Sequence, residues 1–107
     1  MAPPIRVQMK RRHGEVVYEY DIYVGRHCYR GGWELPASIF ANPYPVGTRY
    51  TREESLRLYW NHLFEHRHLL EQLPTLAGKR VGCFCPLEEK GCHVEMLILA
   101  GQTMKYW

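Results

Sequence analysis

Apolar and polar side chains alternate near the start of the chain, as they do in a strand with one buried face. Residues 5–10 alternate in this way, and residues 16–24 are rich in β-branched and aromatic side chains. Residues 12–15 between them, Arg-His-Gly-Glu, supply the chemistry of a turn. The pattern predicts two strands that form a hairpin or lie next to each other in one sheet.

The clearest helix begins after Thr51. This residue is a favourable N-cap, and Glu54 at the third helical position completes a capping box. Apolar residues then recur at three- and four-residue spacing, which places them on one helical face: Leu56, Tyr59, Trp60, Leu63 and Phe64. We expect the helix to continue to Leu73 with a break near His68, and we expect Pro74 to end it.

Two further elements are predicted towards the C-terminus. Residues 80–85 read as a third strand that ends at Pro86. A final helix begins at Cys92 or His93, and Gly101 is expected to end it. Because this helix is apolar nearly all round, we expect it to be buried against a sheet.

The segment from residue 27 to residue 50 is dense in Gly, Pro, Trp and Tyr. We expect an ordered loop packed on the body of the protein, with a short helix near residues 36–40. The predicted order is therefore strand, strand, loop, helix, strand, helix. This order indicates a small single-domain α/β layer fold over residues 1–107, with about three strands and with helices packed on the sheet. The connection between the second and third strands is long enough for a parallel crossover.

Composition and charge fit this prediction and exclude several classes of protein. Of the 107 residues, 46% are hydrophobic and 23% are charged, which is typical of a globular protein and not of a disordered one. The net charge of +3 is too mild to imply a nucleic-acid partner by itself. No apolar run approaches the ~20 residues that span a bilayer, and no signal-peptide stretch follows Met1. We therefore expect an intracellular, cytoplasmic protein with no membrane partner and with reduced cysteines.

The residues with the most chemical potential are concentrated in one short stretch. Three of the four cysteines and one histidine lie within eleven residues: Cys83, Cys85, Cys92 and His93. Arg26 follows the second predicted strand, and the cysteines follow the third. Because the carboxyl ends of parallel strands meet at one edge of a sheet, we expect these side chains to converge there. Ligands bind at this edge in open α/β sheets.

The order and spacing of five motifs resemble a known family: Tyr23-Val24-Gly25-Arg26, Asn42-Pro43, Gly78-Lys79, Cys83-Phe84-Cys85 and Cys92-His93. The family is domain of unknown function 4326, which occurs in bacteria, phages and large DNA viruses, and the resemblance covers residues 21–101. Two positions depart from it. Ala41 stands where members often have Gly, and Val94-Glu95 stands where a Gly and a nearby acid are common. The resemblance implies a shared site and no named activity.

In the first interpretation, these residues form a pocket that binds or processes a small anionic ligand, such as a nucleotide or a nucleic-acid-derived compound. Cys92, His93 and Cys85 are the catalytic candidates, because a helix N-terminus favours a thiolate and an imidazole activates it. Arg26 and Asn42 are the ligand-binding candidates. The guanidinium fork suits a phosphate, whereas Asn42 equally suits a loop turn. Whether the protein is an enzyme stays open on these grounds.

Two alternatives to this ligand-binding pocket stay open. In one, zinc is held by a Cys₃His set, which consists of Cys83, Cys85, Cys92 and His93, and the module contacts nucleic acid through Lys10-Arg11-Arg12 and Arg80. A single residue separates Cys83 from Cys85, fewer than in common zinc motifs, which weakens this alternative. In the other, the cysteines only pack in the core, and a structural protein or homodimer associates through exposed aromatic side chains.

Overall fold

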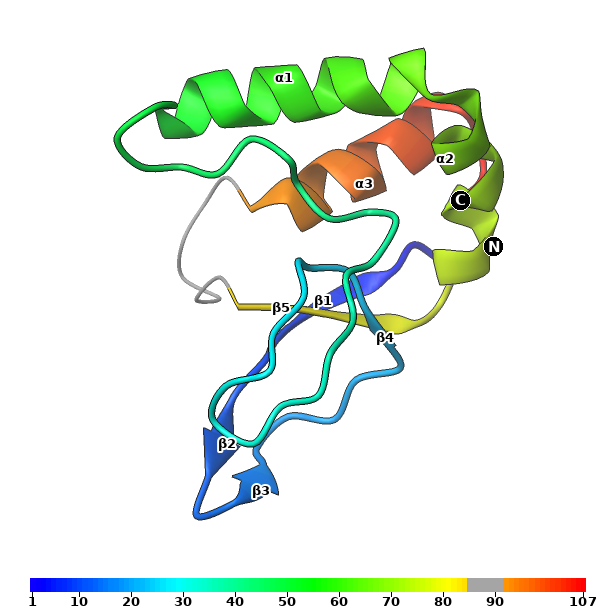
Figure 1. Ribbon diagram of the computed structural model, residues 1–107. Helices are drawn as coiled ribbons and strands as arrows, with labels where there is room; N and C mark the ends of the chain where they lie inside the picture. The colour runs from blue at the N-terminus through cyan, green and yellow to red at the C-terminus, as the bar shows by residue number, and fades with distance from the viewer. Residues whose placement is uncertain (85–91) are drawn as a thin grey trace.

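The structure is a computed structural model that describes residues 1–84 and 92–107. Its elements follow one another as β1 (Ile5–Gln8), β2 (Arg11–Arg12), β3 (Glu15–Val16), β4 (Ile22–Tyr23), α1 (Arg52–Glu65), α2 (Arg67–Gln72), the 3₁₀ turn η1 (Leu73–Leu76), β5 (Arg80–Cys83) and α3 (His93–Thr103). β1, β5 and β4 form a parallel sheet in that order, and β2 and β3 form a separate antiparallel pair. Helices α1 and α3 lie over one face of the larger sheet (Figure 1). The predicted α/β class is confirmed.

The central strand of the larger sheet is β5, which is paired on one side with β1 and on the other with β4. Val81, Gly82 and Cys83 are all buried. A strand that is buried on both faces belongs in the middle of a parallel sheet, where both of its edges are also hydrogen-bonded. Residues 16–24, predicted as one strand, contribute to two, β3 and β4, and β5 separates β4 from β1, so the prediction that the two segments lie next to each other in one sheet was wrong. The predicted turn at residues 12–15 is present, but it joins only the short strands β2 and β3.

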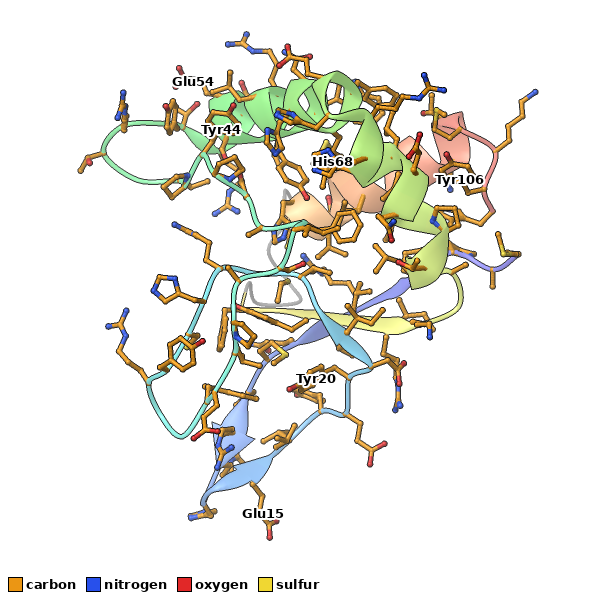
Figure 2. The ribbon with its side chains drawn as sticks, turned by 45° about the vertical axis from the view of Figure 1, so that its right-hand side comes forward. Glu15, Tyr20, Tyr44, Glu54, His68 and Tyr106 are labelled. Carbon is orange, nitrogen blue, oxygen red and sulfur yellow. The ribbon has the colours of Figure 1, made fainter. Side chains whose placement is uncertain are left out.

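Successive residues of β5 face two different hydrophobic clusters. Val81 and Cys83 belong to the larger cluster, which includes buried residues of all three helices. Gly82 faces the other side, where a Cβ atom would overlap the sulfur of Met9. Met9 packs there with Trp33 and Leu35, and Figure 2 shows Tyr20 on this same side of the sheet. The long loop between β4 and α1 therefore covers the face that the helices leave open.

Helix α1 begins as the sequence predicts. The Thr51 hydroxyl accepts a hydrogen bond from the Glu54 N–H at 3.2 Å, and the Thr51 N–H donates to the Glu54 carboxylate at 3.0 Å. The predicted break lies at His66, two residues earlier than expected, and Pro74 falls in the 3₁₀ turn that follows α2. Among the helices that the structure describes, none is long and apolar enough to cross a bilayer.

Two local predictions were wrong. Residues 36–40 form no helix, and Ile39 and Phe40 lie in a turn instead. Helix α3 continues past Gly101 to Thr103. Gly101 does not cap the helix, because it gives room to the ring of Trp107, which a Cβ atom at this position would overlap. The third strand ends at Cys83, and Phe84 lies in a bend, while the predicted strand end at residue 85 lies outside the described residues.

The amino ends of β4 and β5 are joined by an ion pair. The Arg80 guanidinium donates to the two Asp21 carboxylate oxygens at 2.9 and 3.1 Å, and the Arg80 N–H donates to the same carboxylate at 2.7 Å. A second carboxylate, that of Glu19, lies 3.1 Å from the guanidinium. These hydrogen bonds from Arg80 lower the pKa of Asp21 from 3.8 to about 2. Two carboxylates thus compensate the charge of Arg80, which the zinc alternative assigned to nucleic-acid contact.

The lowered pKa of Asp21 predicts a pH dependence of stability. Because the carboxylate is favoured in the folded state, its contribution is fully present above pH 3.8 and is lost as the pH falls towards about 2. We expect Asp21→Asn to lower the free energy of unfolding at neutral pH and to remove part of its decline between those two values. Urea titrations across this pH range measure both effects. Glu34→Gln, at an exposed carboxylate, is the matched control. Equal pH profiles for the three proteins would contradict the assignment.

Candidate functional site

A cavity of about 570 Å³ lies at the carboxyl ends of β4 and β5, beside the N-termini of α1 and α3. Its wall includes Arg26, Asn42, Cys83, Cys92 and His93. The structure therefore brings together all the predicted site residues that it describes, although the chain separates the first from the last by 67 positions. The remaining predicted residue, Cys85, lies outside the described residues. The roles assigned to these side chains stay predictions.

His93 connects α3 to the end of β4. Its Nε2 lies 2.8 Å from the buried carbonyl oxygen of Val24. Since a carbonyl can only accept, Nε2 carries a proton, and in the neutral form of the ring Nδ1 is the acceptor. That nitrogen lies 3.9 Å from the Cys92 sulfur. The ring edge also packs against Tyr59, with the two ring centroids 5.3 Å apart. The imidazole is therefore fixed in orientation and has a basic atom beside a thiol.

Tyr59 holds the other side of the His93 ring in place. Burial raises the pKa of Tyr59, so the phenol stays protonated and donates to the carbonyl of Phe40 at 2.5 Å. This hydrogen bond fastens α1 to the loop just before Asn42. A residue that the sequence placed only on an apolar helical face therefore also positions the site.

Two thiols meet beneath the cavity. The Cys83 and Cys92 sulfur atoms are 3.1 Å apart, and each residue is 1% exposed. Cys83 is the last residue of β5, and Cys92 is the N-cap residue of α3. The two elements that were predicted to carry the site thus bring their sulfur atoms into contact.

The described members of the predicted Cys₃His set give the zinc alternative no support. Tetrahedral zinc, with bonds of about 2.3 Å to sulfur, holds two thiolates about 3.8 Å apart, whereas the Cys83–Cys92 distance is 3.1 Å. The Nε2 of His93 is engaged by the Val24 carbonyl, which leaves Nδ1 as the one ring nitrogen that could act as a ligand. Within residues 1–84 and 92–107, no group of three or more His, Cys, Asp or Glu is placed to hold a metal.

One wall of the cavity is cationic. Arg26, Arg30 and Arg52 line it together with His27, and no Asp or Glu among the described residues does so. Arg26 and Arg30 are exposed, and neither forms an ion pair with another described residue. The Tyr23 hydroxyl donates to the carbonyl of Arg26 and so fixes the turn that presents this guanidinium. The described residues of this wall therefore carry positive charge that suits an anion.

A second part of the lining, the apolar wall, consists of aromatic and aliphatic residues. Tyr23 and Phe84 meet edge to face with ring centroids 5.8 Å apart, and both line the cavity beside Pro45 and Val46. Phe84 is 42% exposed, so part of its ring is open to a bound molecule. Burial raises the pKa of Tyr23 to about 12, and the nearby charge of Arg26 opposes this effect. The Tyr23 phenol is therefore neutral near physiological pH.

Asn42 is tied into the protein. Its side-chain oxygen accepts from the Tyr44 N–H at 2.9 Å, and its amide nitrogen donates to the Ser55 hydroxyl at 2.9 Å. Ser55 donates in turn to the carbonyl of Tyr44, and Figure 2 shows Tyr44 on the loop beside α1. Asn42 therefore has the turn-forming role that the sequence left open as the alternative to ligand binding. One amide hydrogen remains for a ligand.

Sequence reasoning missed several residues of this site, above all Ser55. Ser55, Tyr59 and Leu63 are the buried residues of α1, whereas Phe64, which was placed on the apolar face, is 36% exposed. A serine four residues before a buried tyrosine lies on the same stripe of the helix. A polar residue on an otherwise apolar stripe was the signal that pointed to a buried network.

Comparison with known proteins identifies the family. Residues 7–102 match the family described as Domain of unknown function (DUF4326). The chain belongs to this family. It is also 34% identical over 85 residues to "Uncharacterized protein R718" of Acanthamoeba polyphaga mimivirus, an alignment that covers 79% of this chain and 65% of the relative. The chain thus spans somewhat less than two thirds of that relative's length. No solved structure matches the chain.

One substitution tests the hydrogen-bond network around Ser55 directly. We expect Ser55→Ala to lower the free energy of unfolding by about 1–3 kcal/mol, because the Tyr44 carbonyl and the Asn42 amide lose a buried partner. The gain in helix propensity, at most ~0.7 kcal/mol, is smaller. Chemical denaturation measures the difference. Thr48→Ala, at an exposed loop position, is the control and should change stability little. A Ser55→Ala protein as stable as the parent chain would show that the network adds nothing.

Proposed function

We propose that this domain binds a small anionic ligand that carries a phosphate and a flat aromatic group, as a nucleotide or nucleic-acid-derived compound does. One observation carries the proposal: the described lining of a single cavity combines three arginines with exposed aromatic surface and contains no carboxylate. A cavity of about 570 Å³ is also of the size that small-molecule sites occupy.

The cationic wall supports the phosphate part of the proposal. Guanidinium groups donate two parallel hydrogen bonds to a phosphate, and Arg26 and Arg30 are exposed for such contacts. The N-terminus of α3 lies at the same cavity and adds the positive end of a helix dipole. Neither the arginines nor the N-terminus of α3 selects a nucleotide alone. Together they favour a dianion over a neutral molecule.

The apolar wall supports the aromatic part. Aromatic side chains stack on nucleic-acid bases with about 1–3 kcal/mol per base, whatever the base. Phe84 has its ring partly open and held edge-on by both Tyr23 and Trp33. A ring fixed in this way loses little freedom when a base stacks on it. We therefore assign the base to Phe84 and the phosphate to the arginines.

We also propose that the domain acts chemically on the bound ligand. In the neutral form of the His93 ring, Nδ1 is placed to take a proton from Cys92, which would give a thiolate for nucleophilic attack. The distance of 3.9 Å is longer than a strong hydrogen bond, as is common before substrate binds. Cys92 and His93 are thus the proposed nucleophile and base. The catalytic role predicted for Cys85 falls outside the described residues.

Ligand binding to the purified chain tests the proposal. We expect nucleoside monophosphates to raise the melting temperature and to bind in calorimetry, and we expect ribose phosphate and inorganic phosphate to bind more weakly. Arg26→Gln should weaken nucleotide binding by roughly 10- to 100-fold, because it removes a charged hydrogen-bond donor. Arg57→Gln, on the exposed side of α1, should leave affinity unchanged.

A second pair of variants tests the contribution of the apolar wall to binding separately from that of the cationic wall. Phe84→Ala should weaken binding of the nucleotide but not of ribose phosphate, whereas Phe64→Ala, away from the cavity, should affect neither. The proposal is wrong if no nucleotide binds, or if Arg26→Gln binds nucleotides as well as the parent chain does.

A further inference from the structure

We infer that Cys83 and Cys92 form a redox-active dithiol, which peroxide oxidises to a reversible disulfide. This inference is independent of the proposed ligand. It rests on the contact between the two sulfur atoms, on the elements that hold them and on the base beside Cys92.

The two sulfur atoms are already close to bonding distance. They lie 3.1 Å apart, and a disulfide of about 2.05 Å needs an approach of only about 1 Å. The Cys28 sulfur, whose residue also lines the cavity, makes no comparable contact with another sulfur in the part of the chain that the structure describes. The geometry therefore selects one pair among the three described cysteines.

Rigid elements hold the pair together. The Cys83 carbonyl accepts a hydrogen bond from the Met9 N–H at 2.7 Å, which extends the pairing of β5 with β1. Cys92 precedes His93, which the Val24 carbonyl fixes at 2.8 Å. Neither sulfur has to be recruited from a distant part of the chain, so formation of the bond costs little conformational entropy.

The surroundings of Cys92 favour its reaction. Its position at the N-cap of α3 stabilises a thiolate, and the His93 Nδ1 at 3.9 Å is an acceptor for the thiol proton. Both cysteines line the cavity, which is the route by which a small oxidant reaches them. Peroxide is small enough for a residue that is only 1% exposed.

Peroxide oxidises the two cysteines in two steps. The Cys92 thiolate attacks one peroxide oxygen, an S–O bond forms, the O–O bond breaks, and the departing hydroxide takes the proton held by His93 to give water. The Cys83 thiolate then attacks the Cys92 sulfur, an S–S bond forms, the S–O bond breaks, and hydroxide leaves with the Cys83 proton as a second water. Two electrons pass from the dithiol to one peroxide. A thiol reductant restores both thiols.

Peptide mapping after peroxide treatment tests the inference on the unmodified chain. The protein is exposed to stepped concentrations of hydrogen peroxide, the remaining thiols are alkylated, and the fragments are analysed by mass spectrometry. We expect a Cys83–Cys92 cross-link that lacks two hydrogen atoms and that dithiothreitol reverses, while Cys28 stays open to alkylation. A cross-link between any other pair, or oxidation of Cys28 before this pair, would overturn the inference.

Three variants assign the roles of the two sulfur atoms. Cys92→Ser should abolish the cross-link and slow oxidation of Cys83 at least tenfold, because the attacking thiolate is gone. Cys83→Ser should leave Cys92 reactive and trap it as a sulfenic acid, which dimedone labels. Cys28→Ser should behave as the parent chain. Equal oxidation rates of Cys83 in the parent chain and in Cys92→Ser would contradict the assignment, and the mapping of the parent chain stands even if a variant does not fold.

Discussion

The hydrogen bond from His93 Nε2 to the Val24 carbonyl is the interaction on which the site depends. Val24 is fully buried where β4 ends, and its carbonyl needs a donor that a three-stranded sheet does not supply there. His93 is the first residue of α3, so the same bond sets where this helix begins relative to the sheet. The hydrogen bond also places a proton on Nε2 and leaves Nδ1 facing the Cys92 sulfur. Arg26, two residues after Val24, is thereby brought beside the N-terminus of α3.

The other features of the site follow from this contact between α3 and the end of β4. The helices cover one face of the sheet and the long loop covers the other, so the carboxyl edge of β4 and β5 is where the layers leave a cavity. The Asn42–Ser55–Tyr44 network anchors the loop to α1 and shapes the apolar side. The cationic and aromatic walls then support ligand binding, and the thiol pair beneath them supports redox chemistry. The two proposals share Cys92 and His93, but ligand binding depends on the arginines and Phe84, whereas oxidation depends on Cys83.

The sequence predicted the convergence of the site better than it predicted the sheet. Parallel strands joined by a helical connection have their carboxyl ends on one edge, so Arg26 and His93 could be placed together from the predicted order of strands and helices. Strand order could not be read in this way, because nothing local in residues 5–24 shows that β5 inserts between β1 and β4. The hydrogen bonds of Ser55 were also hidden, since its partners are 11 and 13 positions away along a loop. Gly101 resembled a helix stop, but its small size serves the distant ring of Trp107.

Nitrogen NMR of the His93 imidazole tests the central interaction most directly. In a chain labelled with ¹⁵N histidine, at about pH 8 where imidazoles are neutral, the account predicts a protonated Nε2 and an unprotonated Nδ1. It also predicts a coupling from Nε2 across the hydrogen bond to the carbonyl carbon of Val24. A ring that is protonated on Nδ1, or that exchanges rapidly between the two tautomers, would contradict the account.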